Sequence, residues 1–283
     1  MMIPRLLTKP CNAIFSILFL TFLEIVITSP AHGGNTDQDL LNYAYFSELG
    51  IGEYSTDNRE VRAIQVPFSY QLRPMTEDQW GIKLLFPATF GVLGLDAIDN
   101  IGDVISLDIS ALTLVPGVEL QIPVRKNWVL KPFGQVGAGR SEGGNAFIYS
   151  AGVRSSYTIP WKKFTFTLGN EISFDGFLPS GEEWEDYASI AIGWDTRYPL
   201  GFTLKGAATH IGGWVSYYYF FDELEFEQPL LAPLAIGNQF EIALSFGTYK
   251  KIPIWFFNFD RIGLAYRFSE DLRAIRIVFE FPF

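Results

Sequence analysis

The chain has 283 residues, a formal net charge of −10 and many aromatic side chains, with 26 Phe, 13 Tyr and 7 Trp. The negative charge argues against nucleic-acid binding, which depends on Lys and Arg neutralising phosphates. One cysteine and two histidines exclude metal sites built from thiolate and imidazole ligands, and we expect no cofactor.

Residues 1–31 are typical of a secretory signal peptide. Arg5 and Lys9 precede an apolar core, and small residues before Ala31 mark a cleavage site. The alternative, a membrane-spanning helix, needs a longer apolar run of about 20 residues. Because Cys11 would leave with the signal, the mature chain would contain no disulfide.

Residues 32–283 show a recurring alternation of apolar and polar side chains, which is typical of β-strands with two different faces. In residues 104–115, for example, Ile105, Leu107 and Ile109 alternate with Ser and Asp. The pattern predicts one domain, an all-β, transmembrane, antiparallel up-and-down barrel of about 12 strands with both termini periplasmic. Clear runs cover 60–72, 79–87, 147–157, 164–175, 239–248 and 261–268, and fainter ones cover 41–54, 128–139, 187–197 and 201–213.

Two segments depart from this pattern. The run over 104–115 continues in phase after Pro116, and its total length predicts a bulge or bend at that proline. Residues 214–235 combine five consecutive aromatics with four acids. They could be a strand that extends beyond the membrane into a large loop, a surface-exposed binding loop, or a constriction of the barrel mouth.

The C-terminal residues form the clearest alternating run. Arg276 and Glu280 lie on one face, and the other face is entirely apolar, with Ile275, Ile277, Phe279, Phe281 and Phe283. This arrangement is typical of the last strand of a bacterial outer-membrane barrel, with lipid outside and a polar lumen inside. The alternative is an amphipathic edge strand of a soluble sandwich.

The sign of the charges and the positions of the tryptophans differ between the two ends of the expected strands. The short turns are mostly basic, the opposite ends are mostly acidic, and the tryptophans lie near one rim or the other. Two aromatic girdles of this kind are expected at the two interfaces of a membrane. The pattern therefore predicts the outer membrane of a Gram-negative bacterium, with Trp80, Trp128, Trp161, Trp194 and Trp255 near the short turns and Trp184 and Trp214 near the other rim.

The segment from Pro116 to Leu120 (PGVEL) and the segment from Asn127 to Gly137 (NWVLKPFGQVG), followed by a loop and another strand, resemble the translocator barrels of autotransporters. The resemblance implies about 12 strands. A C-terminal aromatic strand, here with Phe279, Phe281 and Phe283, resembles the signal read by the barrel-assembly machinery.

Only residues 32–41 separate the expected cleavage site from the first expected strand, so we expect no passenger domain. The chain is thus similar to a solitary autotransporter-like barrel, and the secretion of a passenger is not implied. Its expected partners are outer-membrane lipid, lipopolysaccharide and the barrel-assembly machinery.

The inward faces of the expected strands carry both charge signs. These charges could pair across the lumen and block it, or could line a narrow aqueous pore. The expected lumen-lining residues are Lys83, Glu119, Lys131, Arg154, Glu171, Glu241, Arg261, Arg267, Arg276 and Glu280.

Three functions fit this sequence. The first is a non-enzymatic barrel with a structural or surface-interaction role, without catalytic residues, and the second is a small-solute channel. The third is a lipid hydrolase that uses His210, which is expected near the outer end of its strand with Thr209 and Ser216 close by. A lone rim histidine is more often a polar interface residue, so we expect the chain not to be an enzyme.

Overall fold

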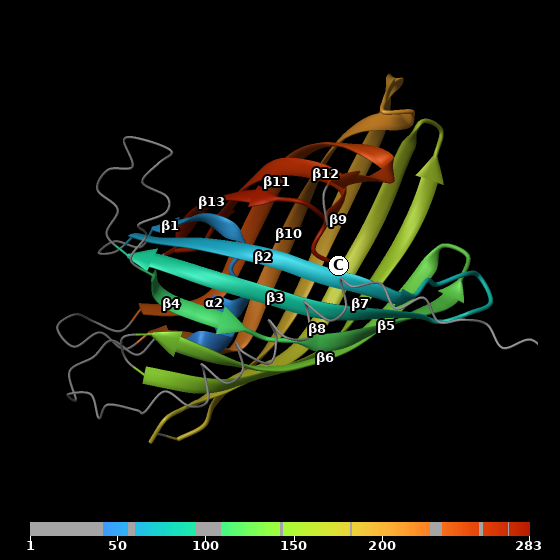
Figure 1. The fold of residues 1–283 in the computed structure, drawn as a ribbon. Coiled ribbons are helices and arrows are strands. Elements are labelled where there is room, and N and C mark those ends of the chain that lie inside the picture. Colours follow the sequence, from blue (N-terminus) through green and yellow to red (C-terminus); the bar gives the residue numbers. More distant parts are fainter. Residues whose placement is uncertain are drawn as a thin grey trace, which may run out of the picture.

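In the computed structural model, the described residues are 42–55, 60–93, 109–141, 144–181, 183–226, 234–254, 257–270 and 272–283. These residues form one closed antiparallel barrel with a short helix inside it (Figure 1). The expected signal peptide lies outside the described residues and stays a prediction.

Thirteen strand segments build the barrel. All neighbours along the chain pair with each other except β4 and β5, and β1 pairs with β13 to close the circle. Two of them share one position, because both β4 and β5 lie between β3 and β6. The wall therefore has 12 strand positions, as the alternating pattern predicts. The segments are β1 (Ile51–Ser55), β2 (Glu60–Arg73), β3 (Gly81–Leu93), β4 (Ile109–Leu114), β5 (Gly117–Arg125), β6 (Trp128–Ser141), β7 (Gly144–Trp161), β8 (Phe164–Pro179), β9 (Glu185–Leu204), β10 (Ala207–Phe226), β11 (Leu234–Ile254), β12 (Phe257–Phe268) and β13 (Arg273–Val278).

The predicted interruption at Pro116 is confirmed, since β4 ends at Leu114 and β5 begins at Gly117. The described part of residues 214–235 is also clear. It continues β10 as far as Phe226, and β11 begins at Leu234. The interpretation of this segment as an extended strand is therefore correct for the described residues.

The two ends of the barrel differ. At one end, which we call the short-turn end, two residues connect β5 to β6, β7 to β8, and β9 to β10, at 126–127, 162–163 and 205–206. Lys205 and Gly206 both have positive φ, 50° and 78°, as a tight hairpin turn requires. The opposite end, where β3 and β10 finish, is called here the long-loop end.

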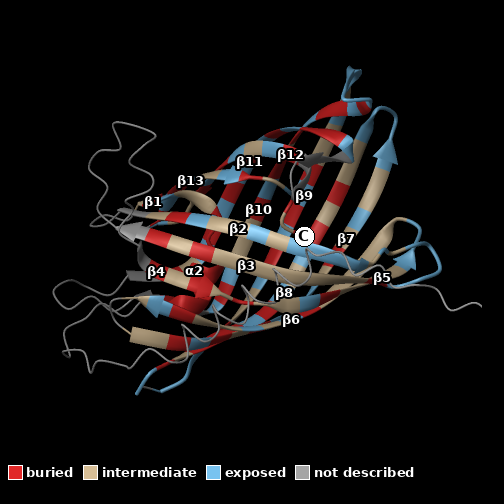
Figure 2. Cartoon of the chain, viewed as in Figure 1, coloured by how far each residue is buried: buried red, intermediate tan, exposed pale blue. Residues whose placement is uncertain are grey.

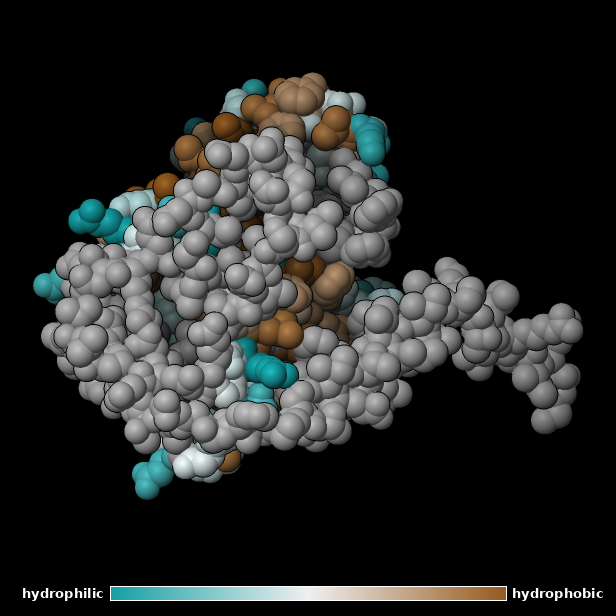
Figure 3. Space-filling model, turned by 60° about the vertical axis from the view of Figure 1, so that its left-hand side comes forward, coloured by the Kyte–Doolittle hydropathy of each residue, from teal (hydrophilic) through white to brown (hydrophobic). Residues whose placement is uncertain are grey.

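The outer wall is apolar and the inner wall is polar. On β11 the outward Ile242 and Leu244 are exposed, Leu244 by 71%, while the inward Glu241 and Ser245 are buried. Figure 2 shows this alternation along the strands, and Figure 3 shows apolar side chains over the upper part of the outer wall. This is the reverse of a soluble sandwich and is the pattern of a barrel that faces lipid.

Residues 43–48 form a helix, α2 (Tyr43–Glu48), where the sequence pattern predicted a strand over 41–54. Asn42 caps the helix, because its side-chain oxygen accepts a hydrogen bond from the Tyr45 amide at 2.9 Å. Its residues Tyr43–Ser47 are buried against the surrounding barrel, whereas Glu48 is exposed. The described part of the chain contains no helix of the length and hydrophobicity needed to span a membrane.

Candidate functional site in the barrel lumen

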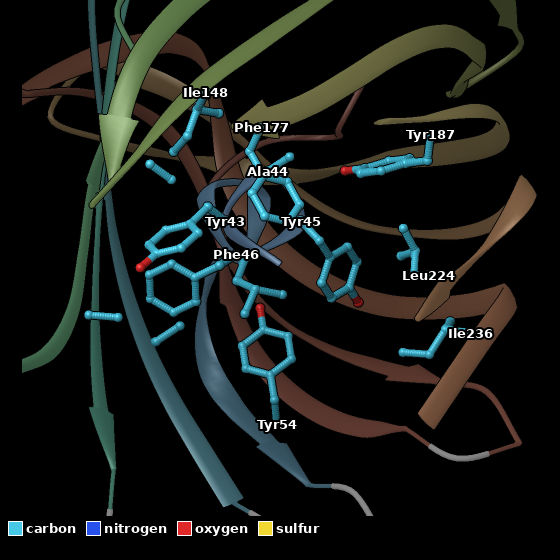
Figure 4. Close-up of a cluster of buried hydrophobic side chains, with 14 of the residues drawn as sticks. Tyr43, Ala44, Tyr45, Phe46, Tyr54, Ile148, Phe177, Tyr187, Leu224 and Ile236 are labelled. Carbon is cyan, nitrogen blue, oxygen red and sulfur yellow. The ribbon is translucent and has the colours of Figure 1, made fainter. Parts of the chain in front are cut away.

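Helix α2 fills the lumen at the long-loop end. Figure 4 shows its aromatic side chains packed among inward side chains of the wall. The Tyr43 ring lies 5.8 Å from that of Phe177 on β8, and the Tyr45 ring lies 6.1 Å from that of Phe220 on β10. The Tyr45 hydroxyl also accepts a hydrogen bond from Gln239 on β11. The helix thus contacts opposite parts of the wall.

The C-terminal end of α2 is fixed to β2 and β3. The carbonyl oxygen of Ser47 accepts hydrogen bonds from Gln65 Nε2 at 2.8 Å and from Thr89 Oγ1 at 3.1 Å. Phe46 packs against Gly91, where a β carbon would lie 2.8 Å from its ring. The missing side chain at Gly91 therefore makes room for the helix.

The last five residues, 279–283, are called here the C-terminal tail, and they enter the lumen at the short-turn half. Strand β13 ends at Val278, and beyond it the side chains of Phe281 and Phe283 are only 7% and 6% exposed. They pack on the inner wall, where Gly169 of β8 and Gly193 of β9 are paired. Figure 1 shows the C-terminus within the outline of the barrel.

This placement corrects an expectation from the sequence. Ile275 and Ile277 are exposed on the outer wall as expected, but Phe281 and Phe283 are not on the lipid side. The alternation predicts a face only while the strand continues, and β13 ends before these residues. The assembly signal assigned to Phe279, Phe281 and Phe283 stays a prediction.

The C-terminal tail crosses the lumen. The Lys131 Nζ atom of β6 donates a hydrogen bond to the main-chain oxygen of Phe283 at 3.0 Å. Strand β6 is nearly opposite β13, with four strand positions between them in one direction (β1, β2, β3 and the position shared by β4 and β5) and six in the other (β12 to β7). The chain end therefore spans from one wall to the facing one.

An ionic cluster lies on the inner wall of β10 to β13. Glu241 accepts hydrogen bonds from Arg267 Nε at 3.0 Å, from Trp214 Nε1 at 3.0 Å, and from Arg276. The Glu241 side chain is almost fully buried. Two arginines and an indole donor compensate the cost of burying this carboxylate.

Two further clusters follow the same principle. Asp195 of β9 accepts a bidentate pair of hydrogen bonds from Arg261, at 2.8 and 3.1 Å, and a third from Arg197 at 3.0 Å. Arg154 of β7 bonds Glu171 at 2.7 Å and lies 3.5 Å from Glu119. Among the described residues, no group of three or more His, Cys, Asp or Glu could hold a metal ion.

The sequence-predicted lumen residues are therefore brought together mainly as ion pairs. Lys83 stands opposite Glu119 in the register of β3 and β5, and Glu280 is an exposed residue of the C-terminal tail. The ion pairs and the lysine contact of the tail use Glu119, Lys131, Arg154, Glu171, Glu241, Arg261, Arg267 and Arg276.

Three lumen residues were missed from the sequence. Trp214 was expected in an interface girdle, but it is buried inside the barrel. Asp175 was assigned to an acidic rim, but it is buried and accepts hydrogen bonds from Ser150 and Ser173. Asp195 lies in phase with other inward residues of its strand, and a stricter count of the alternation would have found it.

His210 lies at the short-turn end, close to the turn at 205–206, whereas the sequence pattern predicted it at the opposite end of its strand. Its imidazole is buried inside the wall, with the Tyr249 ring 4.8 Å away. Neither ring nitrogen has a hydrogen-bond partner among the described residues, and Thr209 donates to the Phe202 carbonyl oxygen instead. The geometry therefore provides His210 with neither a bonded acid nor a bonded nucleophile.

No family model matches the sequence, and no curated protein matches it. Among solved structures, the chain is similar to LpxR from Salmonella typhimurium, with 11% sequence identity and a TM-score of 0.44 over 81% of this chain and 90% of that chain. The likeness concerns the barrel architecture and transfers no residue role.

The expectation that this chain is not an enzyme is wrong as an inference from its barrel class, because a β-barrel fold does not exclude catalysis. The resemblance to autotransporter barrels receives no support from these comparisons and stays a prediction.

Proposed function

We propose that the chain is an integral β-barrel of the Gram-negative outer membrane whose lumen is closed by helix α2 and by the C-terminal tail. The apolar outer wall supports membrane insertion. The observation that carries the closure is the C-terminal tail, which runs from β13 to Lys131 on the facing wall, while α2 fills the other half of the lumen.

In this proposal the short-turn end faces the periplasm, as is usual for bacterial barrels. The outer wall contacts lipid, the long-loop end meets lipopolysaccharide, and the barrel-assembly machinery inserts the chain. The proposed type remains the solitary autotransporter-like barrel with a structural or surface-interaction role.

Closure disfavours the alternative of a permanently open channel. Helix α2 and the C-terminal tail, which we call the two plugs, lie in the long-loop half and the short-turn half of the lumen. A solute would therefore have to pass both. The charges between them are already paired, as expected for ionic groups with little access to water. We therefore expect that the barrel at rest does not conduct.

Fractionation and electrophysiology test the proposal together. The folded protein should be found in the outer-membrane fraction and should shift its gel mobility on heating, and it should give no reproducible conductance steps in planar bilayers. Regular steps at low voltage would contradict a closed lumen, and recovery in the soluble periplasmic fraction would contradict membrane insertion.

Catalysis needs its own experiment. Mass spectrometry of lipid A and phospholipids should compare cells that express the wild type, the His210→Ala variant and no barrel. A lipid change produced by the wild type alone would assign a role to His210. The same change with both proteins would place an activity elsewhere in the barrel.

A further inference from the structure

The barrel wall is incomplete at the short-turn half, between β2 and β12. The ladder between β1 and β2 ends at Ala63, although β2 continues to Arg73. On the other side, the ladder between β12 and β13 ends where Gly263 meets Val278, although β12 begins at Phe257. No described strand lies between these two stretches.

The exposure of β2 agrees with an open edge. In a closed wall, alternate residues are buried, as they are along β11. In β2, four consecutive residues are exposed on both faces, and among them Tyr70 is 62% and Leu72 57% exposed. Within hydrocarbon, each backbone group left without a hydrogen bond costs several kcal/mol, so an open edge at this depth needs a cover.

Two strand positions are vacant here, because β13 ends at Val278 and β1 begins only at Ile51. The C-terminal tail has the alternating pattern of a strand and could extend β13 along β12, in the first of these two positions. Continuing the register from Gly263 and Val278 would place Phe279 opposite Ile262, and Phe281 opposite Asp260. Phe279, Phe281 and Phe283 would then lie on the outer face, and Glu280 would face inward. In the structure, however, Phe281 and Phe283 are in the lumen.

We propose that the open edge of β12 is a docking site for the chain's own C-terminal tail, which pairs with β12 as an extension of β13 and leaves the lumen when it does so. This inference rests on the proposed membrane insertion. The tail has two positions: a lumen position on Gly169, Gly193 and Lys131, and a wall position beside β12. At any moment the tail either occupies the short-turn half of the lumen or covers the edge of β12.

Two cysteine pairs distinguish the positions. Gly169→Cys with Phe283→Cys reports the lumen position, because a β carbon at Gly169 would lie beside that of Phe283. Asp260→Cys with Phe281→Cys reports the wall position. Both pairs should form disulfides in isolated outer membranes, detected by mass spectrometry of the folded, heat-modifiable protein.

The matched control is Ile172→Cys with Phe281→Cys. Ile172 is on the same strand as Gly169 but on the outer face, so this pair should not form. If only the lumen pair forms, the docking proposal is wrong. If Asp260→Cys instead links two chains, a second copy covers the edge, and the proposal is also wrong.

Hydrogen exchange provides a second readout. Oxidising the lumen pair should hold the tail inside and speed amide exchange in residues 258–262 of β12, and reduction should restore protection. Equal exchange in both states would overturn the proposal. A protein that is in the outer membrane and does not conduct, yet fails both tests, would leave the proposed function intact.

Discussion

Gly169 and Gly193 face each other in the register of β8 and β9, and Phe283 occupies the space that their side chains would fill. A β carbon at Gly193 would lie 2.4 Å from the Phe283 ring and 3.1 Å from the Phe281 ring. The lumen position of the tail therefore depends on two residues that have no side chain.

Gly193→Ala should displace the tail while the barrel stays folded. Overpacking of this kind costs about 1–3 kcal/mol, which corresponds to a roughly 5- to 150-fold larger displaced population. Faster digestion of the C-terminus by a carboxypeptidase would report it. Gly134→Ala is the control, since a β carbon there meets nothing within 4 Å, and it should digest like the wild type.

Lys131→Met should also weaken the lumen position. It removes the hydrogen bond of the ammonium to the Phe283 main-chain oxygen, and a bond to a charged group is worth about 1.5–3 kcal/mol. The same carboxypeptidase assay should show faster digestion. Lys163→Met, in an exposed turn, removes the same charge and should not change the digestion rate. If both variants were digested equally fast, the change in net charge would be the cause, and not the loss of the Lys131 hydrogen bond.

Glu241→Ala should destabilise the whole barrel. It leaves Arg267 and Arg276 inside the barrel without their shared carboxylate, and breaking a buried ion pair costs about 3–5 kcal/mol. Guanidinium unfolding in detergent, followed by tryptophan fluorescence, measures the loss.

The control for Glu241 is the pair between Glu53 and Arg62, which is partly exposed. Glu53→Ala should cost no more than about 1 kcal/mol. Similar losses for Glu53→Ala and Glu241→Ala would show that the buried cluster around Glu241 contributes no more than a surface pair.

Deletion of residues 42–49 in the Gly169→Cys/Phe283→Cys variant should make conductance depend on redox state. The oxidised barrel should stay silent, because the tail still spans the lumen, and reduction should give reproducible steps. Steps in the oxidised state would show that the tail does not seal its half. If neither the oxidised nor the reduced barrel conducted, something other than α2 and the disulfide-held tail would block the lumen.

The barrel itself could be predicted because apolar and polar side chains alternate along most of the strands. Pro116 marked the interruption of a run that was too long for one strand. The inward charges also follow from the phase of the alternation. The ion pairs among them depend on the register of neighbouring strands, since Arg154 stands opposite Glu171 and Glu241 stands opposite Arg267. The sequence alone does not give that register.

The two plugs were beyond sequence reasoning for a different reason. Tyr43 and Tyr45 alternate as in a strand, whereas the Asn42 cap and the packing of the aromatic side chains against the wall favour a helix. Trp214 has apolar neighbours on both sides in sequence, so its face is ambiguous. The C-terminal tail keeps the alternation of a strand, and its departure after Val278 depends on tertiary contacts.

The joining of β1 and β13 has a consequence for both plugs. Helix α2 directly precedes β1, and the C-terminal tail directly follows β13. Both plugs are thus attached to the two strands whose pairing completes the cylinder. The pairing of β1 with β13 therefore completes the wall and also brings the attachment points of both lumen segments to the same seam.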